Sequence, residues 1–209
     1  EEATYTIKVG STSTFTNEND IYLYGQSTTI AVQGQEPFIA ALGGGSGMSY
    51  RGSQYIQPHQ GASGGGGSIG SANGTVNAYW AGAKGTPGQG HDGGMALYAW
   101  GGGGGGYSSP GEGREPPYST GAKSGGSGFN LKDSLGLDGT HAATAAFLGA
   151  VSDGGFIAGG GGNLGATPIH GGGAGTNGNA QDYTGGGGGA GSGYGGTGGC
   201  GMVLLIEDV

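Results

Sequence analysis

Glycine makes up 60 of the 209 residues and is gathered in runs, and this feature constrains the fold more than any other. The longest runs are Gly64–Gly67, Gly101–Gly106, Gly159–Gly162 and Gly185–Gly189. Glycine loses more backbone freedom on folding than any other residue, so such runs either stay disordered or pack where only glycine fits. The segments between them carry Tyr, Trp, Phe, Leu and Ile at a density that flexible Gly/Ser linkers lack. We therefore expect an ordered scaffold built from glycine, with flexible linkers as the alternative.

The spacing of the glycines indicates how such runs can pack. Some glycines recur at every third residue, as in Gly82, Gly85 and Gly88. Three residues per turn is the repeat of the polyproline II helix, whose backbone makes no internal hydrogen bonds. Buried amides and carbonyls must then bond to neighbouring segments, which approach closely enough only where side chains are missing. We expect a bundle of such polyglycine II helices, with Gly101–Gly106 in its middle.

The two ends of the chain have strand patterns instead. ATYTIKVG at 3–10 alternates apolar and polar side chains, as in a half-buried strand. Further strand patterns lie at 21–25, 28–34 and 38–45, and MVLLIEDV at 202–209 begins with a continuous apolar run. We expect the C-terminal strand to join the N-terminal strands in one small sheet.

The predicted fold class is mostly irregular and β, a bundle of packed polyglycine II helices on a small β-sheet base. Residues 1–42 are the predicted attachment base, completed by 202–209, and residues 43–201 are the predicted glycine-rich domain with variable loops. The chain begins Glu-Glu-Ala, so we expect a processed product or an excised domain.

Charge and motif content exclude several functions. The net charge is −8 with only six Lys and Arg, which argues against nucleic acid as a partner. The single cysteine, Cys200, rules out an intramolecular disulfide framework, and no apolar run is long enough to insert into a membrane. The four histidines are scattered without metal-ligand spacing, and no nucleophile motif or carboxylate pair is apparent. We expect no enzymatic activity, no cofactor and no metal.

The runs at 64–67, 101–106, 159–162 and 185–189, with aromatic-rich spacers and a closing apolar strand after GGTGGCG, resemble glycine-rich receptor-binding modules of tailed phages. The chain looks most like the tip adhesins on the long tail fibres of T-even-type phages, over roughly 43–201. This resemblance implies a sandwich of polyglycine II helices whose distal loops touch the host surface. It also implies a place at the tail-fibre tip of the virion, outside the cell.

The longest spacers, 48–60, 107–120 and 129–147, are where we expect receptor binding, because long loops on a rigid scaffold usually carry it. Tyr and Arg combine apolar area with a polar or charged group and are favoured at binding hot spots. The alternative for each aromatic residue is packing over glycine helices, which we favour for Trp80, Trp100 and Phe156. The candidate receptor contacts are Tyr50, Arg51, Tyr55, Tyr107, Arg114, Tyr118, Phe129 and Lys132.

The sequence thus predicts a phage tail-fibre adhesin that binds a bacterial outer-membrane protein or a surface polysaccharide and attaches to the rest of a fibre. Rigid loops lose little freedom on binding, which lowers the ordering cost. Two alternatives remain open: a secreted or surface filament subunit whose glycine helices pack between protomers, and an ice-binding protein.

Overall fold

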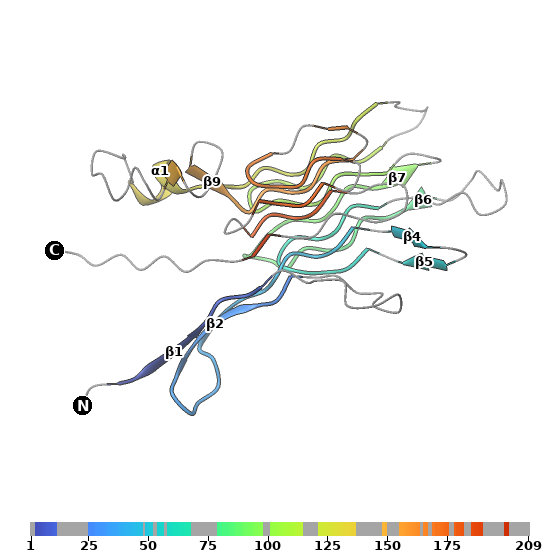
Figure 1. Cartoon of the computed structure of the whole chain (residues 1–209). Coiled ribbons are helices and arrows are strands. Elements are labelled where there is room, and N and C mark those ends of the chain that lie inside the picture. Colours follow the sequence, from blue (N-terminus) through green and yellow to red (C-terminus); the bar gives the residue numbers. More distant parts are fainter. Residues whose placement is uncertain are drawn as a thin grey trace.

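The computed structural model describes residues 3–11, 25–47, 49–51, 54–56, 58–67, 79–97, 101–114, 121–136, 148–149, 155–163, 165–166, 169–175, 178–181, 185–189 and 199–200. Most of these described residues are irregular or extended, and they include small antiparallel sheets and a short helix (Figure 1). The coarse prediction of an irregular, β-containing fold is therefore confirmed. The elements are β1 (Tyr5–Lys8), β2 (Thr28–Val32), β3 (Ile39–Ala41), β4 (Ser49–Arg51), β5 (Gln54–Ile56), β6 (Tyr79–Trp80), β7 (Ala96–Leu97), β8 (Phe129–Asn130), α1 (Leu131–Leu135) and β9 (Phe156–Ile157).

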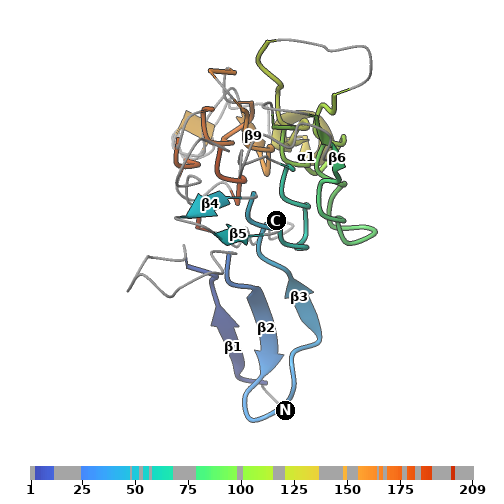
Figure 2. The same ribbon diagram turned by 90° about the vertical axis from the view of Figure 1, so that its right-hand side faces the viewer.

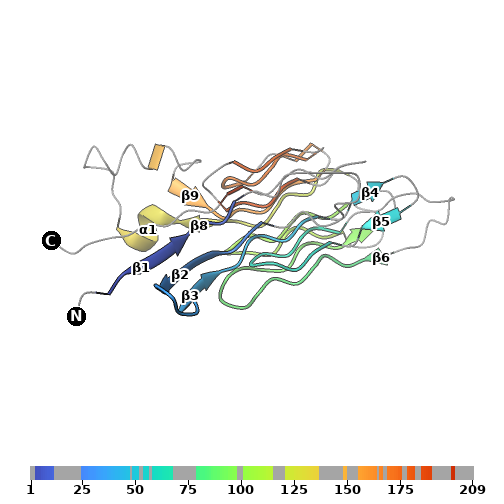
Figure 3. The same cartoon turned by 60° about the horizontal axis from the view of Figure 1, so that its bottom comes forward.

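The glycine-rich segments run lengthwise between two ends of the molecule. One end, here called the base end, carries α1, β8, β9 and the sheet of β1, β2 and β3 (Figures 1 and 3). The opposite end, here called the free end, carries the pairs β4–β5 and β6–β7. The chain therefore crosses the glycine region repeatedly, and spacer elements lie at both of its ends.

The N-terminal sheet is a three-stranded antiparallel meander, in the order β1-β2-β3, that projects from the glycine region (Figure 2). Three of the predicted strands thus form, at 5–8, 28–32 and 39–41. The fourth N-terminal strand pattern, at 21–25, lies outside the described residues except for Gly25. The predicted C-terminal strand at 202–209 lies wholly outside them.

One face of this sheet is apolar. Tyr5 lies opposite Val32, Ile7 opposite Ile30, and Ile30 opposite Ile39 in the register. Because successive residues of a strand point to opposite faces, these side chains share one face. Tyr5 is 56% exposed, and its ring meets that of Phe38 edge to face at 6.2 Å between centroids. The apolar face is therefore open to solvent within the described part of the chain.

In the glycine region, backbone hydrogen bonds join segments that are distant in sequence. The amides of the tract Gly101–Gly106 show the pattern most clearly, because consecutive residues donate to different neighbouring segments at 2.7–3.0 Å. The donor–acceptor pairs are Gly102–Gly67, Gly103–Glu112, Gly104–Gly161, Gly105–Gly64 and Gly106–Ser109. Every third amide returns to the same neighbour, so the amides of the tract donate to three segments in turn. The carbonyls of Gly103, Gly104 and Gly106 accept from further segments, at 91–94 and at 126.

The neighbours approach so closely that most positions of the tract have no room for a side chain. A Cβ on Gly103 would overlap the carbonyl oxygen of Ser124, and one on Gly105 would overlap that of His91. Gly104 is the exception, since its nearest neighbour would be the Gly161 nitrogen at 3.4 Å. Backbone, rather than side chains, thus fills the middle of the molecule.

Few large side chains are buried. Among the described residues, the buried apolar side chains are mainly alanines and leucines, namely Ala31, Ala96, Leu97, Leu131, Leu148, Ala166 and Ala180. Leu131 is buried at the start of α1, where the side chain of Asn130 accepts from the amides of Lys132 and Asp133. Gly136, with φ 64°, ends the helix in the left-handed conformation that glycine adopts readily.

The N-terminal sheet is fastened to the glycine region at β3. The side chain of Gln89 accepts from the amide of Leu42 at 2.7 Å and donates to the carbonyl of Ala40 at 3.4 Å. A primary amide has the same donor and acceptor groups as a peptide unit. Gln89 therefore bonds the outer edge of β3 much as a neighbouring strand would.

Candidate functional site

The free end carries three of the predicted receptor contacts on one hairpin. β4 and β5 pair antiparallel, with Tyr50 opposite Tyr55 and Arg51 opposite Gln54. The hairpin lies at the end opposite the N-terminal sheet (Figures 1 and 3). The structure therefore brings Tyr50, Arg51 and Tyr55 together by backbone position. A fourth candidate, Tyr118, lies outside the described residues.

A second antiparallel pair, β6–β7, also lies at the free end (Figure 1). In β6 and β7, Tyr79 is opposite Leu97 and Trp80 is opposite Ala96. The β7 residues are almost wholly buried, with Ala96 at 0% and Leu97 at 3% exposure. The β7 side chains thus belong to the buried interior of the free end. The predicted receptor contacts at this end belong to the β4–β5 hairpin instead.

Arg114 is not a surface contact, contrary to the sequence-based prediction. Its side chain is 1% exposed, and its Nε donates to the carbonyl of Gly101 at 3.1 Å while a terminal nitrogen donates to the carbonyl of Gly121. Burial lowers the pKa of the guanidinium from its usual value. Arginine has five donors in a planar fork, so one side chain can bond several glycine carbonyls at once. Arg114 is therefore part of the scaffold.

Tyr107, Phe129 and Lys132 lie at the base end, so they do not share a surface with the β4–β5 hairpin. The rings of Tyr107 and Phe129 meet edge to face, with centroids 5.0 Å apart at 75°. Phe129 belongs to β8, which pairs with β9, and Lys132 lies exposed on α1. The candidate contacts from the spacers at 107–120 and 129–147 that the structure describes therefore lie apart from those of the spacer at 48–60.

A second aromatic pair at the base end supports the packing role predicted for Phe156. Its ring stacks on that of His170, with centroids 3.7 Å apart and an interplanar angle of 8°. The Nδ1 atom of His170 accepts from the amide of Gly128 at 2.8 Å, and its backbone has a φ of 51°. A residue other than glycine is strained in this left-handed backbone conformation. The ring stack and the hydrogen bond hold His170 in it. The histidine thus links three segments of the base end. Trp80 and Trp100 have no described side chains.

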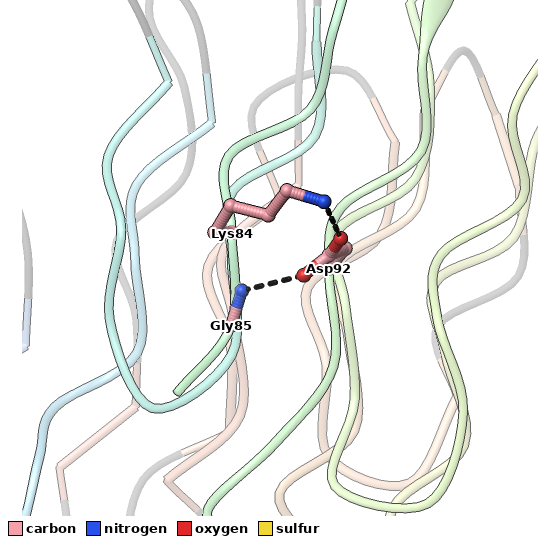
Figure 4. Close-up of polar contacts among 3 residues, drawn as sticks. All are labelled: Lys84, Gly85 and Asp92. Atoms are coloured by element: carbon pink, nitrogen blue, oxygen red, sulfur yellow. Dashed lines mark hydrogen bonds and ion pairs between the residues drawn. The ribbon is translucent and has the colours of Figure 1, made fainter. Parts of the chain in front are cut away.

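An exposed ion pair stands on the turn at 84–92 near the base end. Lys84 Nζ lies 2.5 Å from Asp92 Oδ2, and the Gly85 amide donates to Asp92 Oδ1 at 2.9 Å (Figure 4). The hydrogen bond from Lys84, followed by that from Gly85, holds the pKa of the Asp92 carboxyl below its usual value. Both carboxylate oxygens are already bonded within the turn. The neighbouring groove of about 660 Å³, lined by His91, Asp92 and Tyr107 among others, thus offers no unsatisfied charge.

The described residues carry neither a cluster of metal-ligating side chains nor a membrane-spanning helix. Those residues hold no group of three or more His, Cys, Asp or Glu side chains arranged as metal ligands. None of their helices has the length and apolar character needed to cross a membrane. Comparisons with protein-family models, curated proteins and solved structures find no match to this chain.

Sequence reasoning missed two features of these surfaces. The pairing of β4 with β5 brings Tyr50 and Tyr55 together across a short connection, and the Gly52-Ser53 step between two short aromatic segments is the signal that could have predicted it. The burial of Arg114 has no such signal, because its acceptors Gly101 and Gly121 come from separate segments.

Proposed function

We propose that this chain is a receptor-binding adhesin of a phage tail fibre, in which a rigid glycine scaffold presents the β4–β5 hairpin to a bacterial surface receptor. The observation that carries the proposal is the separation of the two ends: the N-terminal sheet is at the base end, and a hairpin with Tyr50, Arg51 and Tyr55 is at the free end. The receptor is an outer-membrane protein or a surface polysaccharide. The role is binding, without catalysis.

The glycine segments of this scaffold are polyglycine II helices in the proposal. A helix with three residues per turn aims every third amide at the same neighbour. The tract Gly101–Gly106 donates in this order, with Gly102 and Gly105 bonded to one neighbouring segment and Gly103 and Gly106 to another. The C-terminal run 202–209 completes the sheet at the base end.

The proposed mechanism is rigid presentation. The backbone hydrogen bonds between segments fix the positions at which β4 and β5 leave the scaffold, so the hairpin loses little freedom when it binds. Tyrosine and arginine supply the contact area and hydrogen bonds that dominate many interfaces. The buried guanidinium of Arg114 supports the free end from within. Loop sequences can then differ between related adhesins while the scaffold stays the same.

Binding of the purified chain to a panel of bacterial strains tests the proposal. The variant Tyr50→Ala/Arg51→Ala/Tyr55→Ala should weaken binding to a susceptible strain by about 30-fold or more, since one hot-spot residue contributes about 2 kcal/mol or more. The matched control is Tyr107→Ala/Lys132→Ala, which changes exposed residues of the same types at the base end. This control should bind like the unchanged chain.

Two outcomes would overturn the proposal. The first is loss of binding in the base-end control while the free-end variant still binds. The second is absence of binding to every strain of a broad panel by a folded chain whose glycine amides are protected from hydrogen exchange. In either case the β4–β5 hairpin is not a receptor-binding surface.

The exposed apolar face of the N-terminal sheet favours a second candidate, a structural subunit that assembles into a surface filament. Contiguous exposed apolar surface marks interaction sites in soluble proteins. Phe38 is 59% exposed, and Tyr5, Ile7, Val9 and Ile39 are also exposed on this sheet. Electron microscopy of the purified chain separates the candidates, because a filament subunit should form long polymers without any other component.

A further inference from the structure

We infer that the C-terminal segment 202–209 docks as an antiparallel strand on the outer edge of β1, and thereby closes the glycine region into a loop between two strands of one sheet. This inference deepens the proposed base of the adhesin by naming the edge, the direction and the backbone groups involved. It does not depend on receptor recognition at the free end, so the two can fail separately.

The outer edge of β1 has unpaired backbone groups. Within the described residues, β1 pairs only with β2. The amide of Gln33 donates to the carbonyl of Thr4 at 2.9 Å, and the residues that exchange bonds alternate along an antiparallel ladder. Thr6 and Lys8 therefore direct their amides and carbonyls toward β2. The groups that point to the open edge belong to Tyr5, Ile7 and Val9.

The other edge of the sheet is already occupied in part. Gln89 bonds both the Leu42 amide and the Ala40 carbonyl, which are the outward groups at the inner end of β3. A strand that approached β3 would have to displace this side chain. The edge of β1 has no such cover among the described residues, and an unpaired edge is a template for another strand.

The described chain ends beside the sheet, next to the first residue of β2 and the last residue of β3. Gly199 lines a pocket of about 300 Å³ together with Gln26 and Thr28. Gln26 donates its amide to the carbonyl of Ser11 at 3.2 Å, and Thr28 Oγ1 accepts from the amide of Gly10 at 2.9 Å. The C-terminal segment therefore starts at the end of the sheet that enters the glycine region, which is also the end at which β1 finishes. A segment that begins there and follows β1 must run antiparallel to it.

Length and composition fit this edge. Eight extended residues span about 27 Å and the four residues of β1 about 14 Å, at about 3.4 Å per residue. Residues 202–206 are all apolar, so either register places apolar side chains beside those of Tyr5, Ile7 and Val9. Docking therefore widens the apolar face and covers the edge at the same time.

Residue-resolved hydrogen exchange tests the inference, with the full chain compared with a chain that ends at Gly201. In the full chain, the amides of Tyr5, Ile7 and Val9 should exchange at least 10-fold more slowly than in the truncated chain. The amides of Thr6 and Lys8 face β2 and serve as internal controls that should change little. Protection of Gly102–Gly106 in both chains shows that the truncated chain is folded. Adding the peptide GMVLLIEDV to the truncated chain should restore the lost protection.

A second variant tests the same edge without truncation. Ile7→Pro removes one outward amide and leaves the bonds to β2, since proline is tolerated on edge strands. It should make the C-terminal residues more accessible to carboxypeptidase, whereas Thr6→Ser should not. The inference is overturned if Tyr5, Ile7 and Val9 exchange rapidly in the full chain, or if their protection survives truncation because residues 12–24 or a second copy cover the edge. Loss of that protection on dilution would identify a second copy.

Discussion

The N-terminal sheet and the glycine region use the backbone in different ways. In the sheet, β1, β2 and β3 pair in register, and the alternation of side chains decides which face is apolar. In the glycine region, backbone atoms of one segment meet backbone atoms of the next, and no side chain lies between them at positions such as Gly103. Specificity in the sheet thus depends on which side chains are present, and in the glycine region on which are missing.

The sheet and the glycine region also differ in what they expose to solvent and what they bury. The sheet leaves large apolar residues such as Tyr5 and Phe38 more than half exposed. The glycine region buries backbone groups and satisfies them with hydrogen bonds from neighbouring segments. Replacing an exposed side chain of the sheet should therefore change stability little, whereas adding a methyl group should lower stability greatly at most positions of the tract Gly101–Gly106.

The largest expected effect is that of Gly103→Ala. The added Cβ would overlap the Ser124 carbonyl oxygen, and backbone cannot move aside without breaking hydrogen bonds. We expect the free energy of unfolding to fall by about 3 kcal/mol, or the chain to fail to fold. Gly104→Ala is the matched control within the same tract, with an expected change within about 1 kcal/mol. Urea unfolding measures both, and equal effects would contradict close packing around Gly103.

Next in size is Arg114→Met, which replaces the buried guanidinium by an apolar chain of similar length. The carbonyls of Gly101 and Gly121 would lose their charged donors, so the free energy of unfolding should fall by about 2–3 kcal/mol. Lys132→Met serves as the control, because Lys132 is exposed on α1 and its replacement should change stability by less than about 0.5 kcal/mol. Thermal unfolding of both variants checks the difference, and an Arg114 variant as stable as the control would contradict a structural role.

A much smaller effect is expected for Tyr5→Thr in the sheet. Tyr5 is largely exposed, and threonine keeps the preference for a strand, so only the edge-to-face contact with Phe38 is lost. The free energy of unfolding should change by less than about 1 kcal/mol. A loss as large as that of Gly103→Ala in the same urea measurement would mean that the apolar face is covered in solution.

The smallest effect should come from the exposed pair of Lys84 and Asp92. The pKa of Asp92 is lower in the folded chain than in the unfolded one, so its contribution is present above the unfolded value of about 3.9 and is lost as the pH falls through the folded value. Both side chains are well exposed, which limits this contribution to less than about 1 kcal/mol. The stability difference between the unchanged chain and Asp92→Asn should therefore shrink as the pH falls from about 5 to about 2, because the Asp92 carboxylate becomes protonated as the pH falls. A difference that grows as the pH falls would contradict the lowered pKa.

The same contrast explains how much of the structure could be predicted. Alternation of apolar residues at 3–10 predicts β1, since a period of two is visible in the sequence itself. The central place of Gly101–Gly106 was also predicted, because six consecutive glycines can be contacted on all sides, and five of the six are buried. Which segments contact the tract was not predictable, since glycine has no side chain by which to distinguish its neighbours.

The candidate site was predicted less well for a related reason. Tyr50, Arg51 and Tyr55 are close in sequence, so their placement together on one hairpin follows from local pairing. Tyr107 and Phe129 were grouped with them because spacer length gives no information about direction, and the structure places them at the other end. Whether a spacer emerges at one end or the other depends on how many times the chain has already crossed the scaffold.

The order of amide partners along Gly101–Gly106 has a consequence for how such a chain can change in evolution. The amides of Gly102–Gly106 donate to three neighbouring segments in turn. Inserting or deleting a single residue would redirect every later amide to the wrong neighbour, whereas a change of three residues would restore the original partners. The order of acceptor segments therefore repeats every three residues. We expect related scaffolds to differ in the length of this tract by multiples of three residues.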